Sequence, residues 1–247
     1  MYLDRLADEG VRFQAAIERA APDAPIPTCP EWRLRDLVHH TGGIHRWATK
    51  IVAERRSEPL LEDLEIVAGG WPADDDLAAW FRAGHALLLD ALRGAPDDAE
   101  IWSFLRGSPN GAAFWSRRQL HETTVHRVDA ELASGPVSPI AVEHALDGLD
   151  ELLNGFLPRR STKLRPPSTA TISLQPTDDA AGWLVTADPD GPATAPVRTD
   201  DADLVVRGRA SDLYLLLWNR RDVDGLEVKG DATLLDLWRS SVTIRFS

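Results

Sequence analysis

The stretch AAFWSRRQLHETTVHRVDAELAS, residues 112–134, reads as one long helix uninterrupted by proline or glycine. At its centre, HETTVH places Glu122 and His126 four residues apart, so the two side chains share one face of a helix. Asp129 extends this ionisable stripe by one turn. A neighbouring stripe is mainly apolar and consists of Phe114, His121, Val125, Val128 and Leu132. An ionisable stripe beside an apolar face indicates the rim of a helical bundle, where a site can open.

Glu122 and His126 admit two interpretations. On a solvated helix surface they would form an acid–base pair that contributes only about 0.2–0.5 kcal/mol. Facing a bundle interior, they would be two of the donors that a zinc ion requires from at least two segments of a chain. The E-x-x-x-H spacing is a loose pattern, so the second interpretation requires a third donor on a facing helix.

A third donor is available in the helix expected over residues 33–54. Helical spacing places His40 on an inward stripe and its neighbour His39 on a solvated face. The inward stripe consists of Leu37, His40, Ile44, Trp47 and Ile51. An inward histidine alone is more often a hydrogen-bonded core residue than a ligand. His40 therefore becomes a candidate ligand only in combination with Glu122 and His126.

Helical periodicity dominates the first 160 residues. Helices are expected over residues 2–21, 33–54, 74–94 and 112–135, with a shorter one over 139–158. Amphipathic helices joined by loops of varied length are typical of a bundle. The stretch PRRSTKLRPPS, residues 158–168, interrupts this pattern with three prolines.

Apolar and polar residues alternate after that break, which indicates half-buried strands. The expected strands are TATISLQ (169–175), GWLVTA (182–187), DLVVRGR (203–209) and SVTIRF (241–246). Two helices are expected between them, over residues 210–221 and 231–240. The sequence therefore predicts an α+β protein, with a helical bundle over residues 1–160 followed by a small α+β domain over residues 165–247.

Composition excludes several classes of partner and location. The net charge of −12 opposes binding to nucleic acids or anionic membranes, which requires concentrated basic surface. No apolar run approaches the roughly 20 residues of a membrane span, and the acidic start MYLDRLADEG is unlike a signal peptide. The single cysteine, Cys29, excludes an intrachain disulfide. We expect a cytoplasmic protein.

Three segments resemble the mycothiol-dependent maleylpyruvate isomerase family of actinobacteria. They are PTCPEWRLRDLVHHTGGIHRWA (27–48), RRQLHETTVHRVDAE (117–131) and GDATLLDLWRSSVTI (230–244). That family belongs to the DinB-like metal-binding four-helix bundles, and its C-terminal α/β domain is similar to sterol carrier proteins. The likeness spans nearly the whole chain and implies the same two-domain architecture here.

The resemblance also implies a functional site. Its metal would be zinc, or another divalent cation, held by His40, Glu122 and His126. Mycothiol would be the cosubstrate, with Arg220 of the C-terminal domain as the candidate cofactor-binding residue. The alternative for Arg220 is a cation that stabilises a helix C-terminus through the helix dipole. Apart from the resemblance, the position of Asp129 one turn beyond His126 makes it the candidate catalytic residue, which would act by orienting a ligand. The alternative is an acid on the helix surface.

Three protein ligands would leave one position of a tetrahedral zinc ion open, which is the mark of a catalytic site. We therefore expect a zinc-dependent thiol transferase or isomerase, in which mycothiol attacks a small electrophilic substrate. The alternatives are a non-catalytic metal-binding protein and a metal-dependent hydrolase acting through bound water. The expected partners are a small electrophile and a low-molecular-weight thiol, without nucleic acid or membrane, and the chain is expected to be a monomer or a homodimer.

Overall fold

The computed structural model describes residues 1–105, 108 and 111–244, and the chain divides into two compact units, Met1–Ser138 and Pro139–Ser247. The division falls earlier than the boundary at residue 160 that the change in periodicity predicts. The reason is that helix α6 (Val142–Asp150) packs against α7 (Ala210–Leu217) of the second unit. Periodicity identifies a helix but carries no information on the unit against which the helix packs.

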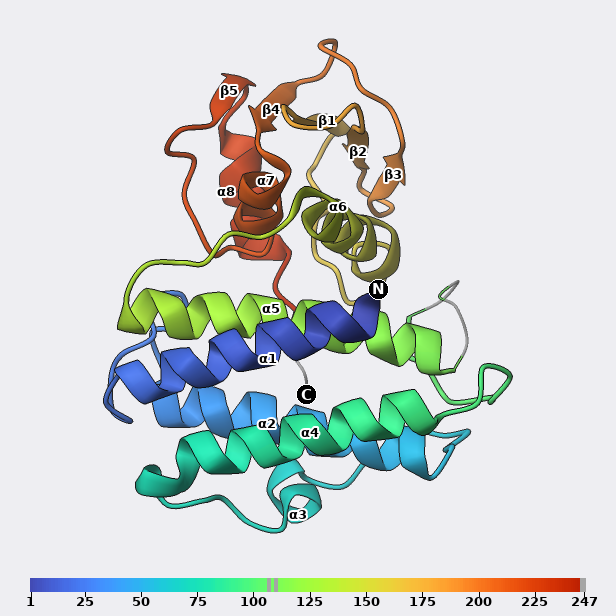
Figure 1. Cartoon of the computed structure of the whole chain (residues 1–247). Helices are drawn as coiled ribbons and strands as arrows, with labels where there is room; N and C mark the ends of the chain where they lie inside the picture. The colour runs from blue at the N-terminus through green and yellow to red at the C-terminus, as the bar shows by residue number, and fades with distance from the viewer. Residues whose placement is uncertain (106–107, 109–110, 245–247) are drawn as a thin grey trace. The chain divides into compact units, whose positions relative to one another are not determined.

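The first unit is a bundle of long helices that run side by side (Figure 1). They are α1 (Tyr2–Arg19), α2 (Leu34–Ala53), α4 (Leu77–Gly94) and α5 (Ala112–Ser134). Helices α1 and α2 each pack against both α4 and α5. Between α2 and α4 the chain forms a short helix, α3 (Leu64–Ala68), and a single 3-10 turn, η1 (Asp74–Asp76). No helix in the described part of the chain is both long and apolar enough to cross a membrane.

The apolar face of α1 is inside the bundle, as its spacing predicts. Leu6, Phe13 and Ile17 are buried, whereas Leu3 is partly exposed. The ring of Phe13 lies 4.6 Å from that of Phe81 on α4, measured between centroids. Burial of each large apolar side chain contributes about 1.5–3 kcal/mol, so this layer holds α1 against α4.

Helix α5 differs from the others because its buried residues include many ionisable ones. Arg118, Arg127, Asp129 and Glu131 are each at most 1% exposed. The sequence places the ionisable stripe at a rim, whereas the structure places it in the interior. A buried charge is costly unless it is paired and hydrogen-bonded. The partners of the α5 charges therefore determine whether this helix can be buried at all.

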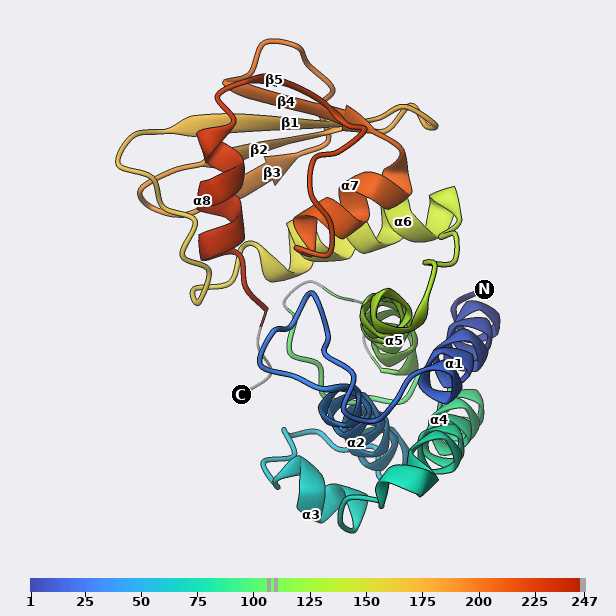
Figure 2. The same ribbon diagram turned by 90° about the vertical axis from the view of Figure 1, so that its left-hand side faces the viewer.

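The second unit is a mixed sheet with helices on one face (Figure 2). In the described residues the strand order is β3-β2-β1-β4-β5, and β1 pairs antiparallel with β2 and parallel with β4. The strands are β1 (Ala170–Pro176), β2 (Trp183–Ala187), β3 (Ala193–Ala195), β4 (Leu204–Gly208) and β5 (Glu227–Gly230). The helices are α6, which continues into a π-helical turn η2 (Glu151–Phe156), then α7 and α8 (Thr233–Ser241). This architecture confirms the predicted α+β class.

The strand predictions have mixed outcomes. Those at residues 169–175, 182–187 and 203–209 are confirmed as β1, β2 and β4. The prediction for 241–246 is wrong where it can be compared: α8 ends at Ser241, and the N–H of Val242 still donates to the helical carbonyl of Trp238, at 2.7 Å. Residues 245 and 246 lie outside the described residues. Strands β3 and β5, of three and four residues, are too short to show alternation.

Arg127 is the centre of a buried charge network that joins α1 to α5. Its Nε donates to Oε2 of Glu9 at 2.7 Å, and its Nη1 donates to Oε2 of Glu131 at 2.7 Å and to the carbonyl of Ser138 at 2.9 Å. Burial opposes the charged form, but Glu9 and Glu131 outweigh it and raise the pKa of Arg127. The network therefore compensates the charges that this part of α5 brings into the interior.

His45 and His85 lie together elsewhere in the bundle, and the centroids of their rings are 5.1 Å apart. The Thr123 hydroxyl donates to the carbonyl of Gln119, so it accepts the Nε2–H of His45 at 3.0 Å. Burial lowers the pKa of both His45 and His85, that of His85 to about 4. Both rings are therefore neutral in the folded protein near neutral pH.

Replacement of Arg127 by methionine is expected to lower the free energy of unfolding by about 3–5 kcal/mol, because Glu9 and Glu131 lose their buried counter-charge. Urea unfolding monitored by circular dichroism measures this. The control is Arg93→Met, since the Arg93–Asp90 pair is exposed at 3.8 Å and such pairs contribute at most about 1 kcal/mol. Equal losses in the two variants would show that the network does not stabilise the bundle.

His85 should make the fold sensitive to acid. Its folded pKa of about 4 is below the value of about 6.5 expected in the unfolded chain. The stability that the neutral ring contributes to the folded protein is therefore fully present above about pH 6.5, and it is lost as the pH falls toward 4. Over that window the wild type should lose up to about 1.4 kcal/mol per pH unit relative to His85→Leu. Urea unfolding of both proteins between about pH 7 and 4.5 tests this. A difference between them that stays constant across the range would contradict it.

Candidate metal centre

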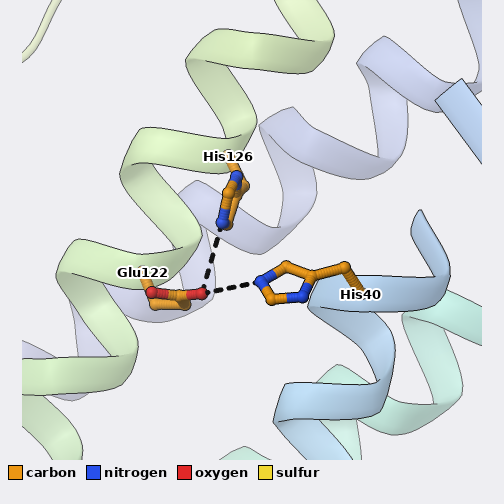
Figure 3. A group of neighbouring side chains, drawn as sticks. All are labelled: His40, Glu122 and His126. Carbon is orange, nitrogen blue, oxygen red and sulfur yellow. Dashed lines mark hydrogen bonds and ion pairs between the residues drawn. The ribbon is translucent and has the colours of Figure 1, made fainter. Parts of the chain in front are cut away.

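The three predicted metal ligands converge within the first unit (Figure 3). His40 comes from α2, and Glu122 and His126 come from successive turns of α5. Oε1 of Glu122 lies 3.3 Å from Nε2 of His40 and 3.3 Å from Nε2 of His126. One donor atom from each of the three residues lies within 4.8 Å of the other two. The structure thus brings together side chains that are 82 residues apart in the sequence.

These separations fit a tetrahedral zinc ion. Zinc bonds of about 2.0–2.2 Å to nitrogen and oxygen place neighbouring donors of a tetrahedron roughly 3.4 Å apart. The two 3.3 Å distances from Oε1 of Glu122 match that edge. Two imidazoles and one carboxylate are also a donor set of catalytic zinc sites. The residues present therefore fit a divalent metal in type, two of the three separations match the expected edge, and the two imidazole donors lie within 4.8 Å of each other.

The donors meet because of helix register and helix packing. The four-residue spacing puts Glu122 and His126 on one face of α5, and α2 packs directly against α5. Trp32, in the loop before α2, packs against both imidazoles, with centroid distances of 5.0 Å to His40 and 6.1 Å to His126. The imidazoles themselves lie edge to face, 5.0 Å apart. The indole therefore restricts the rotation of both rings.

Arg118 and the two histidines keep Glu122 ionised. Burial by itself would raise the pKa of this carboxyl group, but His126, His40 and Arg118 outweigh it and hold the pKa well below its ordinary value. Nη2 of Arg118 donates to Oε2 of Glu122 at 3.1 Å, one helical turn away. Oε2 is thus engaged by the arginine, while Oε1 faces the two imidazoles.

The two histidines have different electrostatic surroundings. Burial opposes protonation of His126, but Glu122 and Asp129 outweigh it and raise its pKa. For His40, burial is the largest influence and lowers the pKa, although its hydrogen bond to Glu122 acts in the opposite direction. His40 is therefore the more readily available neutral donor of the two.

Asp129 and Arg220, the other two residues singled out from the sequence, have different positions. Asp129 is completely buried, and its Oδ2 lies 2.9 Å from Nδ1 of His126, on the side of the ring away from Glu122. Arg220 belongs to the second unit and follows α7, where its Nη1 donates to the carbonyl of Trp218 at 2.7 Å. The donor triad and Asp129 are all supplied by the first unit.

The sequence reasoning did not identify Arg118 and Trp32 as neighbours of the donors. Arg118 precedes Glu122 by four residues, so helical spacing carried a signal that the two side chains share a face. Trp32 lies in an irregular loop, and no periodic pattern relates a loop residue to a facing helix. Its contact with both histidines depends on the tertiary structure alone.

Protein-family models match both units of the chain. Residues 3–131 match the mycothiol maleylpyruvate isomerase N-terminal domain, and residues 143–237 match the MDMPI C-terminal domain. No curated protein matches the chain.

Two solved structures share the fold. A crystal structure of the mycothiol-dependent maleylpyruvate isomerase superimposes with a TM-score of 0.64 at 16% identity, and a mutant of that enzyme with a TM-score of 0.65 at 15% identity. Both comparisons cover 92% of this chain and 91% of the other. The N-terminal family model alone accounts for more than half of the residues, and the chain belongs to the mycothiol maleylpyruvate isomerase family.

Proposed function

We propose that this chain is a zinc-dependent thiol transferase or isomerase that uses mycothiol as cosubstrate and acts on a small electrophile. The observation that carries the proposal is the convergence of His40, Glu122 and His126 at separations suited to one metal ion. Membership of the mycothiol maleylpyruvate isomerase family supports the choice of thiol.

The number of donors supports a catalytic site. Structural zinc ions are closed by four protein donors, whereas catalytic zinc ions have three and keep one position for substrate or water. Among the described residues, no further His, Cys, Asp or Glu joins the group of His40, Glu122 and His126. When bound, zinc would supply a positive charge that favours the thiolate form of a nearby thiol at neutral pH.

The chain's own residues would keep that positive charge only partly neutralised. Glu122 contributes a single negative charge, and His40 and His126 are neutral when they donate a lone pair. Arg118 stabilises the ionised form of Glu122. In this arrangement Nδ1–H of His126 donates a hydrogen bond to Asp129, and Nε2 is the ring nitrogen that faces Glu122. This arrangement favours an anionic cosubstrate such as a thiolate.

Arg220 is the proposed contact for mycothiol in the second unit. The cosubstrate is polar, and its N-acetylcysteinyl and sugar groups require hydrogen-bond donors. A guanidinium group presents five N–H donors in a fixed plane. The bond from Nη1 of Arg220 to the carbonyl of Trp218 fixes part of that plane.

Alanine substitutions test the metal site. The wild type is expected to bind about one zinc ion per chain, and His40→Ala, Glu122→Ala and His126→Ala are expected to lose it, because each removes one of only three donors. Elemental analysis after gel filtration measures the ratio. His39→Ala is the matched control, since the ring of His39 stacks on Trp71 and does not belong to the triad. Stoichiometric metal in all three ligand variants would exclude this site.

Turnover of a panel of electrophiles tests the reaction class. We expect product only when zinc and mycothiol are both present.

Arg220→Met should raise the KM for mycothiol about tenfold or more with little change in kcat, because a charged hydrogen bond contributes about 1.5–3 kcal/mol. Arg209→Met, at the exposed start of α7, is the control and should leave KM unchanged.

The other outcomes of this assay separate the competing functions. Turnover that is independent of mycothiol would identify a hydrolase. A zinc-loaded protein that converts no electrophile would identify a metal-binding protein without this activity. Equal KM values for Arg220→Met, Arg209→Met and the wild type would exclude Arg220 as the mycothiol contact.

A further inference from the structure

The orientation of the His126 ring depends on the carboxylate of Asp129, which contacts Nδ1. For Nε2 to act as a donor, the imidazole proton must reside on Nδ1, and Nδ1 lies 2.9 Å from Oδ2 of Asp129. Asp129 is completely buried. A carboxylate in that position fixes both the tautomer and the rotation of the ring, provided that the carboxylate is itself held in place.

Thr28 holds the other oxygen of this carboxylate. Its hydroxyl donates to Oδ1 of Asp129 at 2.5 Å, from a position 101 residues earlier in the chain. One oxygen of Asp129 therefore faces the donor histidine and the other faces a hydroxyl on a separate segment. Two contacts on opposite oxygens define the rotation of the carboxylate plane, which one contact alone would not.

The loop that carries Thr28 is held by its own backbone. The N–H of Cys29 donates to the carbonyl of Ile26 at 3.1 Å, that of Trp32 to the carbonyl of Cys29 at 2.8 Å, and that of Ile26 to the carbonyl of Trp32 at 3.2 Å. Ile26 is completely buried. The loop therefore presents the Thr28 hydroxyl from a fixed position, close in sequence to the indole of Trp32 that packs on both donor histidines.

We propose that Thr28 is a positioning residue of the metal centre, acting through Asp129 to hold Nε2 of His126 toward the metal. This inference rests on the proposed function, because it requires the triad to bind a metal. The competing role for Thr28 is purely structural, as a tie between the loop and α5. The two roles differ in whether loss of the hydroxyl changes metal affinity or only stability.

Zinc affinity of the purified full chain, measured by competition with a chromophoric chelator, tests the proposal. Thr28→Val should weaken zinc binding about tenfold or more, in the range observed when groups behind metal-bound histidines are removed, and Thr28→Ser should restore it. Thr49→Val is the matched control, because that hydroxyl donates to the carbonyl of His45 within α2, at 2.7 Å. Urea unfolding of the metal-free proteins measures stability separately.

Each outcome decides the question. A wild type that binds no zinc would refute the proposed function, whereas wild-type affinity in Thr28→Val would refute the role of Thr28 alone. Weakening in Thr28→Ser equal to that in Thr28→Val, or equal weakening in Thr49→Val, would also refute it. If Thr28→Val does not fold, Thr28→Ala replaces it, with the same weakening expected and the same zinc affinity as the wild type contradicting the role of Thr28.

Discussion

One oxygen of a buried carboxylate, Oε1 of Glu122, lies 3.3 Å from an imidazole nitrogen on each of two packed helices. An anion in the protein interior is unfavourable by several kcal/mol unless partners compensate it. Arg118, His40 and His126 supply that compensation, so the pKa of Glu122 remains low although the group is buried. The same constraint governs the rest of α5, where Arg127 is paired with two buried glutamates. The bundle therefore contains buried paired charges in addition to its apolar core.

The proximity of His40, Glu122 and His126 could be predicted from the sequence because its parts are local. The spacing of Glu122 and His126 is a property of one helix, and the inward position of His40 follows from the apolar stripe around it. Arg118 carried a similar signal, four residues before Glu122. Thr28 carried none, because its partner is 101 residues away and its loop has no periodicity. Groups that orient a ligand from a distant segment are visible only in the tertiary structure.

The fold shows the same division between local and tertiary information. The long helices and the alternating strands were predictable, because apolar residues recur about every 3.6 residues in an amphipathic helix and every second residue in a half-buried strand. The boundary after Ser138 and the end of α8 at Ser241 depend on tertiary packing, which a short stretch of sequence does not encode. The shared fold at 15–16% identity fits this view, because many sequences satisfy one apolar pattern. A shared fold does not determine function, which depends on the side chains of the site: here His40, Glu122, His126 and the groups that orient them.

We propose that two imidazoles and one carboxylate hold a zinc ion that still accepts a thiol. X-ray absorption at the zinc edge of the zinc-loaded protein, before and after addition of mycothiol, tests this most directly. We expect imidazole scattering with nitrogen and oxygen neighbours at about 2.0–2.2 Å, and one new sulfur neighbour at about 2.3 Å once the thiol is added. A spectrum without imidazole scattering, or one that does not change with mycothiol, would contradict it.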